Sequence, residues 1–485
     1  MNVESRTKVI EEQAVPRNKM KEDLIQHYDR LAPLRDHYRA KNPYYYSLVY
    51  KYYRYFIPEN KKVLEVGCGT GELLHSLKSS WGVGVDISPE MIKVARKKYP
   101  HLTFFAGEIT DLKLEAKFDY IVLPGILGEA EDIQSLLEAL KAFCYPQTRI
   151  IIEYYSYLWQ YVLKMGERLG LKIPTKIQNW ITAQDLMNFL HLAGFEPIKL
   201  ERFTLFPKYI WGFSSWINQY VARLPVMNAL TLNHFFIARP LMEQKQEWNV
   251  SIVIPCRNEK GNIEPVLRRT PIFGQSQEFI FVEGGSRDGT YEEMERVRKQ
   301  YPHKQIRLYK QKGRGKGDAV RSGFLQARGD VLMILDADLT VAPEDLPKFY
   351  QALKDNRGEF INGCRLIYQM EGEAMRFLNL AANKFFGIFF SWLLGQPFKD
   401  TLCGTKVLLR HHYEEIAQER GYFGDFDPFG DFDLIFGASK LNLKIIELPI
   451  RYHRRQYGTS QIQRFRHGLL LLRMCLFALR KIKFI

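Results

Sequence analysis

A glycine-rich turn is the first feature of the sequence whose residue types suggest chemistry. The apolar run at 63–66 ends in a turn that contains Gly67, Gly69 and Gly71. Glycines tolerate a positive φ angle and let the backbone pass close to a ligand. Asp86 follows at the end of the next apolar run, where a carboxylate can accept both hydroxyls of a ribose. The order of strand, turn, helix, strand and acid therefore predicts a nucleoside site.

A pair of carboxylates is the second such feature. The apolar run at 331–336 ends in Asp336, and Asp338 follows two positions later. On extended backbone, side chains two positions apart leave on the same face. Two oxygen ligands at a strand end suit Mg²⁺ or Mn²⁺ bound together with a diphosphate, and the metal would neutralise a leaving nucleoside diphosphate. Such a pair is usually a solvated turn when it stands alone, so its weight depends on the motifs around it.

Both features lie in segments where strand-like and helical runs alternate. The strand-like runs of the first half are 63–66, 82–86, 102–107, 120–124 and 149–155, and those of the second half are 250–255, 278–283, 306–310 and 331–336. This alternation predicts parallel sheets with helices on both faces. Between the two series, residues 156–240 are expected to be mostly helical, with one further β-like stretch near 196–205.

We therefore expect an α/β protein with two domains in series. The first domain spans residues 1–240, with its core at 45–155, and a polar linker follows at 241–248. The second domain spans 249–460, and a basic amphipathic helix is expected in the C-terminal segment 461–485.

The composition excludes several other classes of protein. The chain has 485 residues, 46% of them hydrophobic and 25% charged, which rules out a largely disordered or fibrous chain. The six cysteines are scattered without a C-x-x-C pair, which argues against a zinc site or a disulfide framework and favours a reducing compartment. No apolar run reaches ~18 residues, so we expect no transmembrane helix. The polar N-terminus lacks a signal-peptide core.

The net charge of +15 predicts anionic partners, and its distribution suggests which ones. After Glu447 the last 38 residues carry nine positive charges and no negative one, on both sides of an apolar run at 468–479. This pattern is typical of an amphipathic helix on an anionic membrane surface; a helix docked on its own domain is the alternative. We expect no nucleic-acid partner, because the charges lie beside apolar runs and lack a stacking groove.

A second apolar run, at 375–395, contains Arg376 and Lys384. We expect it to form an interfacial helix at the same surface, and a core helix with two charged residues at its edge is the alternative.

The glycine-rich turn resembles the first motif of class I S-adenosylmethionine-dependent methyltransferases, E/D-x-G-x-G-x-G, with Glu65 in the acidic position. The resemblance implies a Rossmann-like fold and S-adenosylmethionine as cofactor. It covers 45–155 well and 156–240 only as a cap or substrate region. By this resemblance Asp86 would hold the ribose and Glu108 would lie near the adenine. A domain that binds the cofactor without methyl transfer, as a regulatory module, is the alternative.

The methyl acceptor and its activation stay open in the sequence. Methyl transfer needs little protein chemistry beyond placing the sulfonium against the nucleophile. Glu153, Tyr154 and His191 are candidates to activate the acceptor, and the sequence does not rank them.

The second half resembles family-2 glycosyltransferases of the GT-A fold across about 249–460. The motifs that carry the resemblance are 250–259, 281–290, 312–324 and the carboxylate pair. It implies a nucleotide-sugar donor bound by Pro255, Glu259, Glu283, Lys316 and Asp336. It also implies a divalent metal ion, Mg²⁺ or Mn²⁺, on Asp336 and Asp338.

Within that family the polyprenyl- or dolichyl-phosphate sugar transferases match best. Segments 361–365, 400–406, 432–440 and 447–460 parallel their motifs. The resemblance implies that an acceptor phosphate is bound by cationic and polar residues: Arg365, Arg376, Lys406, Arg455 and Ser460. Two departures are Glu283-Gly284-Gly285-Ser286 in place of D-D-G-S, and Thr340 where the family often has Gln.

The need for a catalytic base depends on the acceptor. A phosphate monoester is largely ionised near pH 7 and needs none, whereas a sugar hydroxyl needs one. Asp400, Asp431 and Asp433 are the candidates.

These patterns together predict a bifunctional transferase, cytoplasmic and peripheral at the inner face of the membrane. Its C-terminal half would transfer a sugar by inverting displacement to a lipid-linked acceptor such as polyprenyl phosphate, in cell envelope glycan biosynthesis. Its N-terminal half would be a methyltransferase. The alternative is a glycosyltransferase for a soluble or nascent glycan with a non-catalytic cofactor-binding module.

Overall fold

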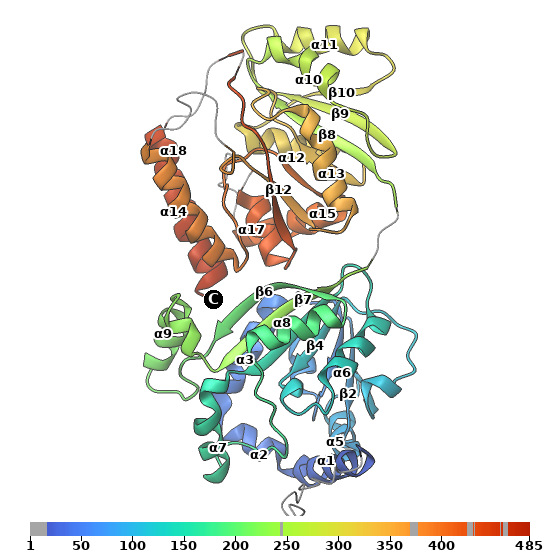
Figure 1. Cartoon of the computed structure of the whole chain (residues 1–485), viewed down its shortest axis with the longest axis vertical. Helices are drawn as coiled ribbons and strands as arrows, with labels where there is room; N and C mark the ends of the chain where they lie inside the picture. Colours follow the sequence, from blue (N-terminus) through green and yellow to red (C-terminus); the bar gives the residue numbers. More distant parts are fainter. Residues whose placement is uncertain are drawn as a thin grey trace, which may run out of the picture. The chain divides into compact units, whose positions relative to one another are not determined.

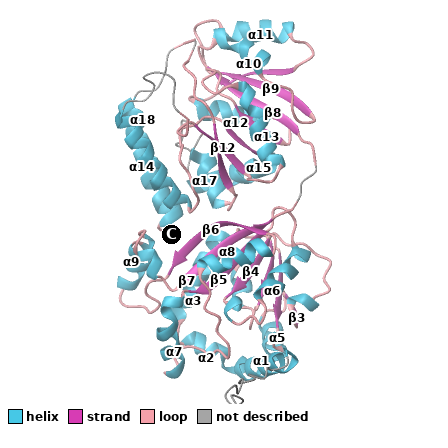
Figure 2. Ribbon diagram, viewed as in Figure 1, coloured by secondary structure: helices cyan, strands magenta, loops and turns pink. Residues whose placement is uncertain are grey.

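The computed structural model describes residues 17–242, 246–368, 377–423, 430, 432–455, 457–458 and 464–485. These residues form two compact units. Unit 1 runs to Ala193 and also includes Pro207–Tyr209 and Leu232–His234; unit 2 comprises Gly194–Phe206, Ile210–Thr231 and Phe235–Ile485. Each sheet of the protein has seven strands, and helices pack around each sheet (Figure 1, Figure 2).

The first sheet has the strand order β3-β2-β1-β4-β5-β7-β6. Its strands are β1 (Lys62–Val66), β2 (Trp81–Asp86), β3 (Thr103–Ala106), β4 (Tyr120–Pro124), β5 (Arg149–Tyr155), β6 (Phe195–Phe203) and β7 (Asn233–Pro240). β1 pairs in parallel with β2 on one side and with β4 on the other, so the strand order reverses its direction at β1. Ligands of open α/β sheets bind at such a point, beyond the carboxyl ends of the strands.

The helices that lie between or before these strands in the chain are α1 (Arg17–Leu31), α2 (Arg35–Ala40), α3 (Pro43–Phe56), α4 (Glu72–Ser76), α5 (Pro89–Lys98), α6 (Ile133–Ala139), α7 (Gln160–Arg168), α8 (Ala183–Leu192) and α9 (Phe213–Gln219). Two of them show clear start signals. α5 begins after Ser88, whose hydroxyl accepts from the Met91 N–H at 3.1 Å. α8 begins with a capping box formed by Thr182 and Asp185. Both are standard helix starts.

The second sheet has the order β10-β9-β8-β11-β13-β12-β14. Its strands are β8 (Asn249–Cys256), β9 (Ser276–Glu283), β10 (Gln305–Lys310), β11 (Val331–Ile334), β12 (Phe360–Cys364), β13 (Lys406–Leu409) and β14 (Ile445–Pro449). The helices of this part are α10 (Ile263–Arg269), α11 (Thr290–Gln300), α12 (Lys316–Gln326), α13 (Leu346–Lys354), α14 (Phe377–Leu394), α15 (Arg410–Gln418), α16 (Arg420–Phe423), α17 (Phe432–Lys440) and α18 (Arg464–Ala478).

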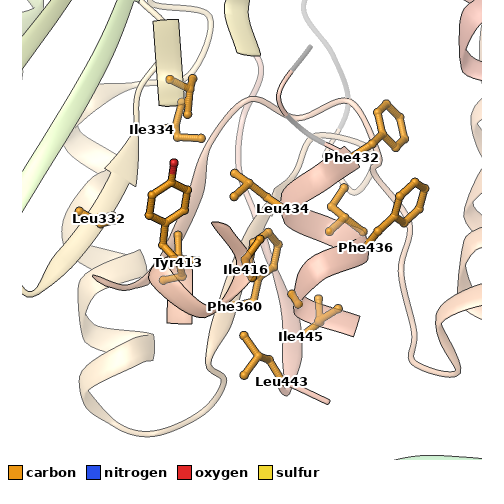
Figure 3. Packing of buried hydrophobic residues seen from close by; sticks show 14 of the residues in the cluster. Leu332, Ile334, Phe360, Tyr413, Ile416, Phe432, Leu434, Phe436, Leu443 and Ile445 are labelled. Carbon is orange, nitrogen blue, oxygen red and sulfur yellow. The ribbon is translucent and has the colours of Figure 1, made fainter. Parts of the chain in front are cut away.

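A hydrophobic core covers each face of the second sheet. Along β8, Val253 belongs to one cluster and its neighbours Ile252 and Ile254 to the other, as the two-residue period of a strand requires. Figure 3 shows the first cluster, in which side chains from β11 meet those of α15 and α17. Its labelled members are Leu332, Ile334, Phe360, Tyr413, Ile416, Phe432, Leu434, Phe436, Leu443 and Ile445.

Two expectations about the strands were wrong. The second sheet is mixed, because β13 pairs antiparallel with β11 and β12. This short strand enters the sheet from a long segment after α14, without the helical crossover that parallel neighbours need. The stretch 233–240, expected to be helical, forms β7 and is buried throughout. Its apolar run, 235–238, is too short for periodicity to separate a buried strand from a buried helix.

Of the apolar run at 375–395, residues 377–394 form α14, which packs partly in the core as the alternative expected, while its interfacial role stays a prediction. Phe390, Leu393 and Leu394 are buried in the core, whereas the Phe385 and Ile388 side chains are exposed. In the part of the chain that the structure describes, no helix is long and apolar enough to cross a membrane.

Candidate active sites

The glycine-rich turn connects β1 to α4 in a conformation that only glycine adopts readily. Gly67, Gly69 and Gly71 have φ angles of +80°, +52° and +84°. A Cβ atom on Gly71 would lie 2.8 Å from Cζ of Phe104, and one on Gly67 would lie 2.9 Å from Cδ1 of Ile126. Both the backbone angle and the close packing therefore require glycine at these positions.

The Gly71→Ala variant is expected to lower the free energy of unfolding by about 2–4 kcal/mol, because left-handed backbone strain adds to overpacking against Phe104. Gly166→Ala is the matched control, because Gly166 lies inside α7 and the nearest atom to its added Cβ is 3.8 Å away. Alanine in a helix should leave stability unchanged or raise it slightly. Denaturant unfolding of both variants measures the difference, and equal stability would contradict this account of the turn.

Asp86 ends the neighbouring strand β2, and backbone N–H groups hold its carboxylate beside the turn. Its carboxylate accepts from the Gly69 N–H at 2.7 Å and from the Ser88 N–H at 3.0 Å. Burial raises the pKa of Asp86, although these two backbone donors and Arg35 oppose the shift. Arg35, at the start of α2, approaches the same turn: a Cβ on Gly69 would lie 3.8 Å from its Nε. The sequence analysis missed Arg35, because its contact depends on a helix far from the motif.

A cavity of about 800 Å³ lies in unit 1 beside the turn. It is lined by Glu65, Gly67, Gly69, Asp86 and Glu108 of the predicted site. Burial raises the pKa of Glu65 well above its usual value, and its Oε2 has no hydrogen-bond partner among the described residues. Glu108 forms an ion pair with Lys21 of α1, at 3.1 Å. The predicted cofactor residues therefore line one cavity, with the exception of Gly71.

Glu153 is the only one of the three candidate activating groups that lines this cavity within the described chain. It lies at the end of β5, is buried, and burial raises its pKa to about 7 although Asn233 opposes the shift. The Asn233 amide donates to Oε1 of Glu153 and, at 2.8 Å, to the hydroxyl of Tyr45. Oε2 faces Gly125: a Cβ there would lie 3.7 Å away.

Tyr154 and His191 lie elsewhere. The hydroxyl of Tyr154 is buried 3.3 Å from Nδ1 of His234, and His191 is exposed on α8. Tyr155, two residues after Glu153, lines the cavity instead of Tyr154. Its hydroxyl accepts from the Tyr45 hydroxyl at 3.2 Å.

The carboxylate pair of unit 2 lies just after β11, and each carboxylate has a cationic partner. Lys316 Nζ is 2.6 Å from Oδ1 of Asp336, and Arg455 Nη2 is 2.6 Å from Oδ2 of Asp338. Arg455 also reaches Glu259, with Nη1 at 3.3 Å from Oε1. Burial raises the pKa of Asp336, but Lys316 outweighs it and the pKa lies below its usual value. The structure thus brings together residues from four distant motifs.

Two backbone segments hold the carboxylates of Asp336 and Asp338 in place. Leu339 has a φ of +56°, and the N–H and hydroxyl of Thr340 donate to Oδ1 of Asp338 at 3.1 and 2.7 Å. A Cβ on Gly404 would lie 1.9 Å from Oδ2 of Asp336, so the segment before β13 passes directly over this carboxylate. Thr340 therefore orients Asp338 where the family often has a glutamine.

The loops after β8 and β9 are tied together beside the pair. Asn258 has a φ of +57°, its N–H donates to Oγ of Ser286 at 3.0 Å, and its Oδ1 accepts from the Arg287 N–H at 2.8 Å. Glu283 ends β9 and accepts from the Ser286 N–H at 2.5 Å. Pro255 lies in β8, opposite Val282 of β9.

A carboxylate that the sequence analysis missed joins these loops to a third segment. Asp288 accepts from the Lys260 N–H at 3.2 Å and from the Tyr457 hydroxyl at 3.2 Å. The sequence feature that could have revealed Asp288 is its position two residues after Ser286.

Arg365 and Asp400 form a bidentate pair. Nε and Nη2 of Arg365 donate to the two carboxylate oxygens, each at 2.8 Å, and the Arg365 N–H donates at 2.9 Å. Burial raises the pKa of Asp400, but Arg365 outweighs it and keeps the pKa below its usual value. This arrangement favours a positioning role for Asp400 over that of a base.

The other predicted acceptor and base residues are distributed as follows. Lys406 is fully buried, and its ammonium donates to the Cys403 carbonyl. Asp433 lies 3.6 Å from Nη1 of Arg321 and 3.6 Å from Nε of Arg420. Arg376, Asp431 and Ser460 lie outside the described residues. Within the described chain, no group of three or more His, Cys, Asp or Glu side chains is arranged to hold a metal ion.

Comparisons with known proteins match each half separately. Residues 37–200 match the family model described as a methyltransferase domain, and residues 251–415 match glycosyl transferase family 2. A structure from Thermotoga maritima, described as a "SAM-dependent methyltransferase, possible histamine N-methyltransferase", aligns with a TM-score of 0.36 and 17% identity over 44% of this chain and 99% of that one.

Curated relatives match the second half. A "Dolichol-phosphate mannosyltransferase" of Pyrococcus furiosus is 38% identical over 222 residues, which are 44% of this chain and 59% of the relative. An "Undecaprenyl-phosphate 4-deoxy-4-formamido-L-arabinose transferase" of Photorhabdus laumondii is 26% identical over 45% of this chain and 65% of its own length. The chain thus spans about three fifths of the length of these relatives.

Proposed function

The chain joins a methyltransferase domain to a glycosyl transferase family 2 domain, and from this premise we propose that it is a bifunctional transferase, peripheral at the cytoplasmic face of a membrane. Its C-terminal half moves a sugar from a nucleotide sugar to a lipid-linked acceptor such as polyprenyl phosphate, with inversion at the anomeric carbon. Its N-terminal half methylates an envelope glycan or its precursor. The domains are 1–240 and 249–460, with a linker at 241–248 and a basic segment at 461–485.

The observation that carries sugar transfer is the convergence of cations and carboxylates at Asp336. Asp336 and Asp338 fit Mg²⁺ or Mn²⁺, which take one or two protein carboxylates when substrate phosphates complete the ligand shell. When bound, the metal supplies positive charge for the leaving diphosphate. Lys316 and Arg455, each 2.6 Å from one carboxylate, are positioned to exchange these partners for diphosphate oxygens. Pro255, Glu259 and Glu283 belong to the nucleoside side of the site.

The acceptor is a phosphate monoester, in agreement with the names of the relatives. Arg365, Lys406 and Arg455 supply cations for it, and the sequence motifs add Arg376 as a further cation and Ser460 as a hydroxyl donor. Its oxygen is already ionised near pH 7 and needs no base, which suits the locked pair of Arg365 and Asp400. Acceptance by a soluble glycan hydroxyl would instead require a base, for which Asp433 and Asp431 are the candidates.

The methyltransferase site uses the cavity of unit 1. The glycine turn leaves its backbone open to a ligand, and the buried Oε2 of Glu65 without a partner fits a ligand that brings a donor or a positive charge, as S-adenosylmethionine does. Asp86 and Glu108 bind the same cofactor. The bound cofactor supplies an electrophilic methyl group. Glu153 removes the proton from an acceptor hydroxyl, because it is a buried carboxylate that lines this cavity.

Membrane association rests on the outer faces of α14 and α18. Phe385 and Ile388 on α14 and Leu472 and Leu476 on α18 are exposed apolar side chains. The basic residues Arg473 and Arg480 are exposed near the last two. Exposed apolar side chains with neighbouring cations suit the headgroup region of an anionic bilayer.

The test is sugar transfer by the purified chain from a panel of nucleotide sugars, with and without polyprenyl phosphate. We expect transfer that requires both the lipid and Mg²⁺ or Mn²⁺, and that EDTA abolishes. Transfer to soluble glycan fractions but not to the lipid would move the acceptor to the alternative class. Absence of transfer to any lipid extract with metal present would refute the proposal.

A further inference from the structure

The mouth of the unit 1 cavity is rimmed by an unusually exposed apolar helix. No residue of α7 is buried. Along residues 157–171, which we call the α7 rim, seven apolar or aromatic side chains are exposed: Tyr157, Leu158, Tyr161, Val162, Met165, Leu169 and Leu171. Tyr161 retains 83% of its accessible surface and Leu169 65%. Contiguous apolar surface of this kind is rare on a monomer unless something covers it.

The same segment forms part of the cavity wall. Trp159, Val162, Leu163 and Met165 line the cavity that also contains Glu153. The exposed apolar surface of the rim and the wall of the cavity that contains Glu153 therefore share side chains, Val162 and Met165 among them.

The charges around the rim are almost all positive. Lys164 and Arg168 are exposed on α7. Lys41 and Lys208 adjoin the rim's end, because Nζ of Lys41 donates to the Gly170 carbonyl at 2.9 Å and Nζ of Lys208 to the Lys41 carbonyl at 3.1 Å. The one acidic residue of the rim, Glu167, pairs with Lys172. Each cation near an anionic bilayer adds to the attraction.

We propose that the α7 rim lies on an anionic phospholipid surface and that the methyl acceptor of this cavity is lipid-linked. Its hydroxyl-bearing glycan would reach Glu153 while its apolar anchor stays with the rim and the bilayer. This inference rests on the methyltransferase activity proposed above and names the class of its acceptor. A protein partner fits less well, because the cores of protein interfaces are depleted of lysine, whereas here cations are interspersed among the apolar side chains.

The test uses a thiol-reactive, environment-sensitive dye, because all six native cysteines are buried. The dye is placed at Tyr161→Cys, and in a second variant at Leu169→Cys. The control is Lys93→Cys, on α5 of the same unit, whose side chain is 75% exposed. With phosphatidylglycerol vesicles we expect a blue shift of emission at 161 and 169, weaker in high salt and absent with phosphatidylcholine alone. The dye at 93 should not respond.

Three results would overturn the proposal. The first is binding to vesicles without a shift at 161 or 169, or no vesicle binding at all. The second is a shift that follows protein concentration without vesicles, which would identify a second copy of the chain as the occupant. The third is radiolabelled methyl recovered from membrane incubations only in aqueous glycan fractions. Total formation of S-adenosylhomocysteine is measured in the same incubations, so that failure of the rim is distinguished from absence of the proposed methyl transfer.

Discussion

Asp336→Asn is expected to reduce sugar transfer about 1000-fold, which corresponds to about 4 kcal/mol of lost transition-state stabilisation. The carboxylate is half-buried, and Lys316 at 2.6 Å holds its pKa below the usual value. Asparagine preserves its shape but removes the negative charge that would hold a metal ion. It also leaves the Lys316 ammonium without its carboxylate partner. Transfer is measured at saturating nucleotide sugar and metal, so that the loss appears in kcat.

The matched control is Asp330→Asn, at the opposite end of β11. The Asp330 carboxylate accepts from the Asn249 N–H at 3.1 Å and lies outside the site. This variant should keep its sugar transfer, and both variants should keep the methyl transfer of the N-terminal half. If Asp336→Asn transfers sugar at the wild-type rate, the carboxylate pair is not the donor site.

The two sites differ in the sign of their buried charges, and this difference suits their reactions. Around Asp336 the carboxylates are matched by Lys316, Arg455 and Arg365. A diphosphate and a phosphate acceptor would bring further negative charge, which those cations can receive. The unit 1 cavity instead contains Glu65 and Glu153, whose pKa values burial raises. A cationic cofactor and an acceptor proton are the ligands that such carboxylates favour.

The sequence predicted those parts of each site that lie within one short segment. The glycine turn with Asp86 and the pair of Asp336 and Asp338 are local patterns, because a strand end fixes the direction of the residues that follow it. Long-range contacts were not readable. Arg455 reaches Asp338 and Glu259 from segments 117 and 196 residues away in the chain. Asn233 reaches Glu153 from a strand that periodicity alone could not distinguish from a helix.

The antiparallel strand β13 shows a further limit. Its four residues are too few for a period to be visible, and its direction depends on where the preceding segment crosses the sheet. The pairing of Asp400 with Arg365 likewise became evident only from the fold, although both residues belong to predicted motifs. The residue type of Asp400 therefore suggested a catalytic base, whereas its pairing with Arg365 favours a positioning role.

Glu153→Gln is expected to reduce methyl transfer about 100-fold or more above pH 7, because glutamine cannot accept the acceptor's proton. Burial raises the pKa of Glu153 to about 7. The wild-type rate should therefore rise with pH through about 7 and then level off, and the variant should lose this rise. Formation of S-adenosylhomocysteine with a membrane lipid extract gives the rate. Glu138→Gln, an exposed residue of α6, is the control and should keep the wild-type profile.

A second measurement separates catalysis from folding. The folded pKa of Glu153 lies above the ordinary value of 4.5, so the folded chain binds this proton more tightly than the unfolded chain. Its contribution to stability is complete below the ordinary pKa and falls as pH rises towards 7. Glu153→Gln removes this dependence and should unfold at a higher temperature than the wild type at pH 8. A variant that is less stable at pH 8 would contradict the raised pKa of Glu153, and a variant that keeps the pH-dependent rate would exclude Glu153 as the base.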